Sequence, residues 1–188
     1  MSTGNVLRAG TRIRILIFLQ VALLLAVSQC HPPLSPEEGG AGFEVGQAFR
    51  SFELKNLDGE EKTLGDFLSK VTLVTFCFPT CGPCNAELPH FQRFHETYSP
   101  QGLTVVAINV IPEQDSQVRE WSSEKGFTFP ILVGGDSGRL IEDYQLVATP
   151  LSFLIDSNGQ ILARFDGYRS GQETEIEERI RKELGVGS

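Results

Sequence analysis

The chain has 188 residues, of which 40% are hydrophobic and 21% are charged, and its formal net charge at pH 7 is −8. This acidic balance, with no basic patch after residue 30, argues against a nucleic-acid partner. The four cysteines are too few for a disulfide-stapled framework, and only two of them are spaced as an obvious pair.

Residues 1–30 have the organisation of an export signal. Three arginines precede an apolar run over 15–27, which has the length of a signal-peptide core and is short for a membrane span. The run leads to Cys30 in a context that resembles a bacterial lipoprotein box, so Cys30 is a candidate for lipidation. Ordinary cleavage after Ser28 and an uncleaved N-terminal anchor are the alternatives. In each case we expect an exported bacterial protein of the periplasm or cell envelope, and lipidation or an uncleaved anchor would hold it at the membrane.

Residues 31–42 are rich in Pro, Gly and Glu and have almost nothing to bury, which predicts a flexible linker. Residues 43–188 are enough for one domain with a single hydrophobic core. We therefore expect three parts in the chain: the signal or anchor, the linker and one folded domain.

Strand and helix patterns alternate along the folded domain, which predicts an α/β sandwich with a mixed sheet. The final helix is expected to open on a Ser170-x-x-Glu173 capping box, and its Glu177–Arg181 and Glu178–Lys182 pairs have the i,i+4 spacing of surface ion pairs. In chain order the elements are a hairpin strand at 51–57 with its turn at 58–59, a helical turn at 64–68, a buried strand at 71–77, a helix at 82–98, a buried strand at 103–110, a helix capped by Asp115 and closed by Gly126, a short strand at 129–133, a short helix at 137–144, a hairpin of 151–156 and 160–165 about Asn158-Gly159, and a last helix that Gly185 ends.

The sequence Cys81-Gly82-Pro83-Cys84 lies where a buried strand gives way to a helix. Two thiols separated by two residues can close a small, reversible disulfide. Cys81 falls at the helix N-terminus, where free N–H groups and the helix dipole stabilise a thiolate. We therefore expect Cys81 to be the nucleophile and Cys84 to be the resolving thiol.

Other uses of a cysteine pair are less compatible with these residues. His90 and His95 follow the pair, but they stand too close to it for a usual Cys2His2 zinc site. Asn85 occupies the position where haem attachment requires histidine. A purely structural disulfide over such a short loop would restrain little entropy in the unfolded chain. Cys77, on the buried strand, is interpreted as an inert thiol.

The order of elements resembles the thioredoxin fold, and more narrowly the exported thiol:disulfide oxidoreductases of the TlpA/ResA type. The matching motifs lie at 52–59, 84–89 and 148–159 and so extend over most of the domain. The resemblance implies a mixed sheet flanked by helices, with an N-terminal hairpin extension and a central insertion. The chain departs from the family at 76–80, where tryptophans commonly precede the first cysteine.

The resemblance also assigns roles to residues outside the cysteine pair. It implies that Pro150 is a cis-proline beside the disulfide, which would leave the Thr149 backbone free to pair with a substrate strand. Gly82 and Pro83 would belong to the same substrate-binding surface. Glu87 follows Cys84 by about one helical turn, and if it is buried it could exchange protons with that thiol; a solvated helix glutamate is the alternative.

Together these features predict a protein disulfide reductase that needs no cofactor or metal beyond the redox-active Cys81–Cys84 disulfide. Its clients would be disulfide-containing exported proteins, with apocytochrome c as one candidate, and a membrane electron-transfer partner would re-reduce it. Two other functions remain to be compared with this one. A thiol peroxidase would require a Pro-x-x-x-Thr-x-x-Cys motif, which fits neither Cys81 nor Cys84, and a copper or zinc carrier would need a third ligand.

Overall fold

The strand β3 (Val71–Cys77) lies inside the sheet, and all of its residues are buried. The computed structural model describes residues 43–187, and β3 pairs there in parallel with β4 (Leu103–Asn109) and antiparallel with β6 (Leu151–Asp156). Because both edges and both faces of β3 are covered, its sequence is a continuous apolar and β-branched run rather than an alternating one. β3 therefore carries the chain through the core directly to the cysteine pair.

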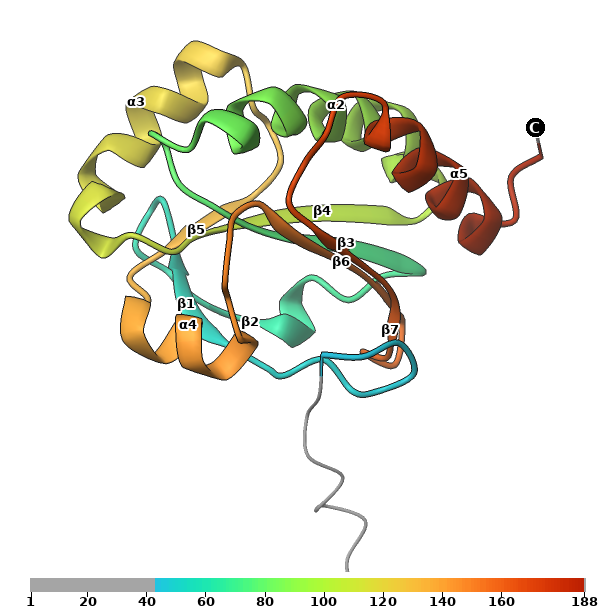
Figure 1. The fold of residues 1–188 in the computed structure, drawn as a ribbon, viewed down its shortest axis with the longest axis horizontal. Helices are drawn as coiled ribbons and strands as arrows, with labels where there is room; N and C mark the ends of the chain where they lie inside the picture. The colour runs from blue at the N-terminus through green and yellow to red at the C-terminus, as the bar shows by residue number, and fades with distance from the viewer. Residues whose placement is uncertain (1–42, 188) are drawn as a thin grey trace, which may run out of the picture. The chain divides into compact units, whose positions relative to one another are not determined.

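Seven strands form one mixed sheet in the order β2-β1-β5-β4-β3-β6-β7 (Figure 1). The predicted N-terminal hairpin is formed by β1 (Glu53–Asn56) and β2 (Glu61–Thr63), and β1 also pairs antiparallel with β5 (Ile131–Val133). At the other end, β6 and β7 (Ile161–Asp166) form the hairpin predicted from the Asn-Gly turn, with Gly159 at a φ of +78°.

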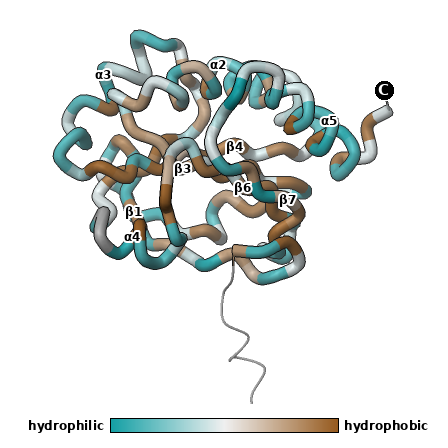
Figure 2. Tube along the Cα trace, viewed as in Figure 1, coloured by the Kyte–Doolittle hydropathy of each residue, from teal (hydrophilic) through white to brown (hydrophobic). Residues whose placement is uncertain are grey.

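Helices cover both faces of the sheet (Figure 1). On one face, α2 (Gly82–Tyr98), α3 (Asp115–Lys125) and α5 (Gln172–Leu184) contribute to a hydrophobic cluster that includes Cys81 and Cys84. On the other face, α4 (Ser137–Tyr144) packs in a second cluster together with the aromatic residues that precede β1. β5 and α4 lie between α3 and β6 in the chain. The hydrophobic stretches of Figure 2 follow the inner strands between these layers, and the arrangement is a thioredoxin fold.

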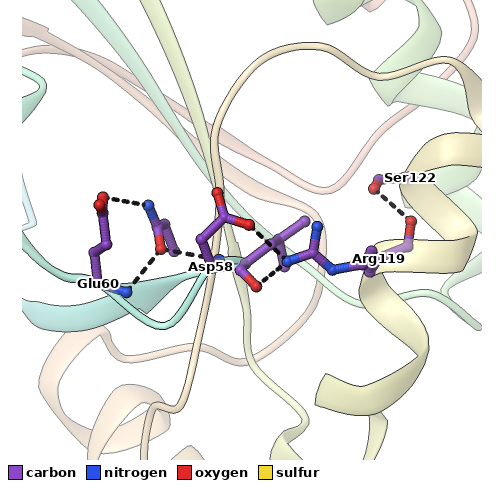
Figure 3. A network of polar contacts seen from close by, with 6 residues as sticks. Asp58, Glu60, Arg119 and Ser122 are labelled. Carbon is purple, nitrogen blue, oxygen red and sulfur yellow. Dashed lines mark hydrogen bonds and ion pairs between the residues drawn. The ribbon is translucent and has the colours of Figure 1, made fainter.

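The hairpin is joined to α3 through Arg119 (Figure 3). The Arg119 guanidinium donates to the Leu57 carbonyl oxygen and lies 2.9 Å from Asp58 Oδ1. The Asn56 carboxamide braces the same turn, because its Oδ1 accepts from the backbone N–H groups of Asp58 and Glu60. These contacts hold the turn of the N-terminal extension against the helix that follows β4.

Two helix N-termini differ from the sequence-based expectation. Asp115 is the first residue of α3 rather than its cap, and its carboxylate accepts from Asn109 Nδ2 and the Gly134 backbone N–H instead. The capping box predicted at Ser170 is wrong: the chain turns at Gly171, with a φ of +95°, and Glu173 accepts from the Gly171 backbone N–H. In both cases a more distant donor or a positive-φ glycine replaced the local cap that the sequence pattern favoured.

The predicted i,i+4 ion pairs of Glu177 and Glu178 on α5 are not the ones that form. Glu177 instead binds Arg93 of α2 through two hydrogen bonds of 2.8 Å and accepts a third from the Tyr98 hydroxyl at 2.7 Å. The i,i+4 pair on this helix joins Arg179 and Glu183. Glu177 therefore forms its ion pair across the α2–α5 contact rather than with a residue of its own helix.

The expected signal segment 1–30, with Cys30, and the linker 31–42 lie outside the described residues, as does Ser188. No helix within residues 43–187 is both long and apolar enough to cross a membrane.

Candidate active site

Cys81 and Cys84 form a disulfide at the start of α2, with their Cα atoms 5.2 Å apart. Cys81 is the N-cap residue, and its Sγ accepts from the Cys84 backbone N–H at 3.2 Å. The exposed fraction is 4% for Cys81 and zero for Cys84. Cys81 is therefore the more exposed of the two cysteines and the one whose sulfur receives a helix N-terminal N–H group, which are the two properties expected of an attacking thiol.

The residues around Cys81 present a small, uncharged surface. Gly82 and Pro83 are exposed in the first turn of α2, where the fixed φ of proline suits the helix and its missing N–H is not needed. Residues 78–86 and 145–151 contain no charged side chain. A partner segment can approach the disulfide here without having to desolvate charged groups of the protein.

Thr149 and Pro150 lie beside the disulfide, as the resemblance implied. The Thr149–Pro150 peptide bond is cis, and Thr149 Oγ1 lies 3.6 Å from Cys81 Sγ. Pro150 is buried, and its carbonyl oxygen accepts from the Gly167 backbone N–H at 2.8 Å. The start of β6 thus brings the loop at 145–150 onto the α2 N-terminus from a position distant in sequence.

Glu87 is fully buried on α2, so the structure contradicts the alternative of a solvated helix glutamate. Its Oε2 accepts from the Ser152 hydroxyl at 3.3 Å, while its Oε1 has no hydrogen-bond partner. Loss of water raises the pKa of Glu87 to about 8, and the Ser152 hydrogen bond offsets part of that rise. A carboxyl group with such a pKa can gain or lose a proton near neutral pH.

Two further titratable side chains interact electrostatically with Glu87. Burial raises the pKa of the Cys77 thiol, and the charge of Glu87 raises it further, so Cys77 stays a neutral thiol as expected. Burial and a 2.8 Å hydrogen bond to Glu173 raise the pKa of Tyr168 to about 12, with a smaller effect of Glu87. Cys77 and Tyr168 therefore stay uncharged while Glu87 titrates.

The Ser152 and Thr75 hydroxyl groups were not anticipated from the sequence. The two residues face each other across the antiparallel β3–β6 pair, both are fully buried, and their oxygen atoms are 2.8 Å apart. A signal was present, since both residues are hydroxyl side chains within mainly apolar strands. The cross-strand register that places Thr75 opposite Ser152 cannot be read from either strand alone.

The histidines considered as metal ligands contact other groups. The His90 ring lies 6.1 Å from the Tyr168 ring, and His95 Nδ1 is 3.0 Å from the Ser99 hydroxyl. Within the described part of the chain, no three His, Cys, Asp or Glu side chains gather in a way that could hold a metal ion.

Comparisons with known proteins agree with this geometry. Residues 45–164 match the AhpC/TSA family. The thiol-disulfide oxidoreductase ResA of Bacillus cereus is 27% identical over 171 residues, which cover 91% of this chain and 94% of the relative. The thioredoxin-like protein YneN of Bacillus subtilis is 34% identical over 122 residues, or 64% of this chain and 70% of the relative. A thiol:disulfide interchange protein of the thioredoxin family from Chlorobium tepidum superposes with a TM-score of 0.62 at 25% identity, covering 73% of this chain and 96% of that one. The chain therefore belongs to the AhpC/TSA family and, within it, is of the thioredoxin-like TlpA/ResA type.

Proposed function

We propose that the protein is a thiol-disulfide oxidoreductase that reduces disulfides of exported proteins. The observation that carries this proposal is the Cys81–Cys84 disulfide itself, whose Cys81 sulfur accepts the Cys84 N–H at the α2 N-terminus beside Thr149 and Pro150. The thiol-disulfide oxidoreductases among its relatives support the same chemistry.

The reaction proceeds through two exchanges. In the first, the Cys81 thiolate attacks one sulfur of a client disulfide, forms a mixed disulfide and releases the other client sulfur as a thiolate. In the second, the Cys84 thiolate attacks Cys81 Sγ, which frees the second client sulfur and closes the Cys81–Cys84 disulfide. Two electrons pass to the client, and the oxidised form seen here is the product state.

The buried carboxylate of Glu87 is proposed to take the proton that Cys84 must lose before the second exchange. Glu87 lies one turn after Cys84, its Oε1 is unpartnered, and its pKa of about 8 lets it carry a proton near neutral pH. Thr149 and Pro150 are proposed to position the client strand next to Cys81, with Gly82 and Pro83 on the same surface.

Reduction is the favoured direction because Gly82-Pro83 is the dipeptide of thioredoxin. An exported reductant must be recharged, and we propose a membrane electron-transfer partner for that step. We further propose that the N-terminus anchors the protein in the cell envelope, through lipidated Cys30 or an uncleaved signal. Apocytochrome c, whose haem-attachment cysteines must be reduced, remains a candidate client.

A thiol peroxidase is the second function to test, because the AhpC/TSA family match does not by itself separate it from a reductase. The missing peroxidase motif around Cys81 and Cys84 favours the reductase. A copper or zinc carrier lacks support from a third ligand beside the cysteine pair in the described residues.

The decisive assay compares disulfide reduction with peroxide consumption by the same reduced protein. We expect the wild type to reduce the insulin disulfides and Cys81→Ser to be inactive, whereas Cys77→Ser retains activity as the matched thiol control. Peroxide turnover that matches or exceeds insulin reduction would replace the reductase with the peroxidase. Stoichiometric metal retained by the reduced, dialysed protein would favour the carrier.

A further inference from the structure

The side chain of Asn85 makes three hydrogen bonds next to the disulfide. The exchange chemistry does not explain these hydrogen bonds. Its Nδ2 donates to the Pro79 carbonyl oxygen at 2.7 Å and to the Cys81 carbonyl oxygen at 2.9 Å. Its Oδ1 accepts from Trp121 Nε1 at 2.9 Å. The carboxamide therefore uses both of its donor hydrogens and its acceptor, and it connects α3 to the segment that leads into Cys81.

Trp121 fixes which way the Asn85 carboxamide points. An indole N–H can only donate, so the atom that faces it must be the amide oxygen. This leaves the amide NH2 for the two carbonyl oxygens on either side of Thr80. If the carboxamide turned over, its oxygen would face the Pro79 and Cys81 carbonyls, and both hydrogen bonds would be lost.

The two carbonyls belong to the residues that set the position of the attacking sulfur. The Cys81 carbonyl also accepts the Asn85 backbone N–H at 3.0 Å, which begins the α2 hydrogen-bond ladder. A second contact from the start of α3 reaches the same segment, where Gln114 and Thr80 exchange hydrogen bonds of 3.0 and 3.2 Å. That contact is exposed, whereas Trp121 is only 8% exposed, so the indole contact is the better shielded from water.

We propose that Trp121 and Asn85 form a clamp that positions Cys81 for attack, with Trp121 acting through Asn85. Neither residue touches the reacting sulfurs, so both are positioning residues. The clamp keeps Cys81 Sγ where it accepts the Cys84 N–H, and this contact is the one that stabilises a thiolate in the reduced protein. The inference rests on the proposed role of Cys81 as the attacking thiol.

A pH measurement on Cys81 has to account for the titratable groups on the elements around it, among them Cys77 in the same hydrophobic cluster. Cys84 and Glu87 lie on the same helix, and Glu113 and Asp115 flank Gln114 in the segment that contacts Thr80. The facing loop at 145–151 contains no charged side chain. A Cys84→Ser background removes the nearest of these groups and leaves the clamp intact.

Trp121 is the only tryptophan in the chain, so a tryptophan analogue can replace its indole N–H at this one position. Incorporating β-(3-benzothienyl)alanine in place of tryptophan replaces the indole N–H by sulfur and retains both rings at position 121. The matched variants are Asn85→Ala, the combination of both changes, and Phe127→Leu. Phe127 packs edge-on against Trp121 at 5.4 Å, so its replacement disturbs the packing and leaves the N–H in place.

The measurement is the iodoacetamide alkylation rate of Cys81 in the full-length Cys84→Ser chain from pH 5 to 9, quantified on the Cys81 peptide by mass spectrometry. We expect the tryptophan analogue to lower the rate at pH 6 by about threefold and to shift the midpoint of the profile upward, because more of the thiol stays protonated. Asn85→Ala should do at least as much, and the combination no more than Asn85→Ala alone. Phe127→Leu should leave the midpoint unchanged.

An unchanged profile for the tryptophan analogue, additive effects in the combination, or an equal shift in Phe127→Leu would each overturn the clamp. If the analogue incorporates poorly, Trp121→Phe provides a second way to remove the indole N–H. We expect the same upward shift in the midpoint of the alkylation profile. Alkylation needs only the reduced thiol and no client, so its result stands even if insulin reduction fails and the proposed function is withdrawn.

Discussion

The Ser152 hydroxyl lies 3.3 Å from Oε2 of Glu87, and both side chains are completely buried. The hydrogen bond joins β6, which follows the cis Thr149–Pro150 bond, to α2, which carries both cysteines. A carboxyl group in this position cannot be rehydrated by a small side-chain movement, so its protonation state depends on the groups packed around it. Ser152 is the one that stabilises the charged form.

Glu87 should make the stability of the oxidised protein depend on pH. Its pKa is about 8 in the folded chain against an ordinary value of 4.5, so the folded protein binds the proton more tightly than the unfolded chain does. Its contribution to stability is then fully present below pH 4.5 and is lost as the pH rises through 8, by roughly 5 kcal/mol in total. Denaturant unfolding at pH 5 and pH 9 measures this loss. Glu87→Gln should remove most of the difference, and an equal pH dependence in both proteins would contradict the buried carboxylate.

Ser152→Ala should raise the pKa of Glu87, because the ionised carboxylate loses its only hydrogen-bond donor in the described structure. A hydrogen bond to a charged group contributes roughly 1.5 kcal/mol, so the shift should be about one pH unit. It would be read as an upward displacement of the pH range over which stability is lost. In the Glu87→Gln background the serine substitution should cause no displacement; a displacement there would show that Ser152 acts on another group.

Glu87→Gln should also change the reactivity of Cys84 in the reduced protein. Removing a nearby negative charge favours the thiolate, so the pH profile of Cys84 alkylation should move to lower pH. The second exchange should then lose its dependence on the protonation of residue 87 between roughly pH 5 and 9. Superimposable alkylation and insulin-reduction profiles for the two proteins would leave the mechanism with Cys81, Cys84 and Pro150 alone.

Local patterns in the sequence were sufficient to predict the elements and the cysteine pair. The continuous apolar run of β3, the Asn-Gly turn between β6 and β7, and the Cys-Gly-Pro-Cys motif each lie within a few consecutive residues. The burial of Glu87 was open, because helical spacing shows which side chains share a face but not what covers that face.

Several of the interactions that were missed join residues far apart in the chain. The Ser152–Thr75 contact depends on the register between two strands, and the Trp121–Asn85 hydrogen bond joins residues 36 positions apart. Glu177 binds Arg93 on another helix rather than a neighbour on its own. Such pairings are decided by packing between elements, which local propensity does not encode.

Because Cys81 is assigned as the attacking thiol and Cys84 as the resolving thiol, their serine substitutions should give different results. Cys81→Ser should abolish exchange, since Cys84 is fully buried and cannot reach a client disulfide. Cys84→Ser should perform one attack and then stall, because no thiol remains to resolve the mixed disulfide. Iodoacetamide labelling of the reduced wild type at neutral pH provides the control: faster labelling of Cys84 than of Cys81 would reverse the assignment.

The most direct test of the mechanism is to incubate reduced Cys84→Ser with a peptide that contains a single intramolecular disulfide, and to map the product by mass spectrometry. The account predicts a covalent adduct joined through Cys81, released by dithiothreitol and absent when Cys81 is also replaced by serine. An adduct through Cys77, or no adduct under conditions in which the wild type reduces the same peptide, would contradict it.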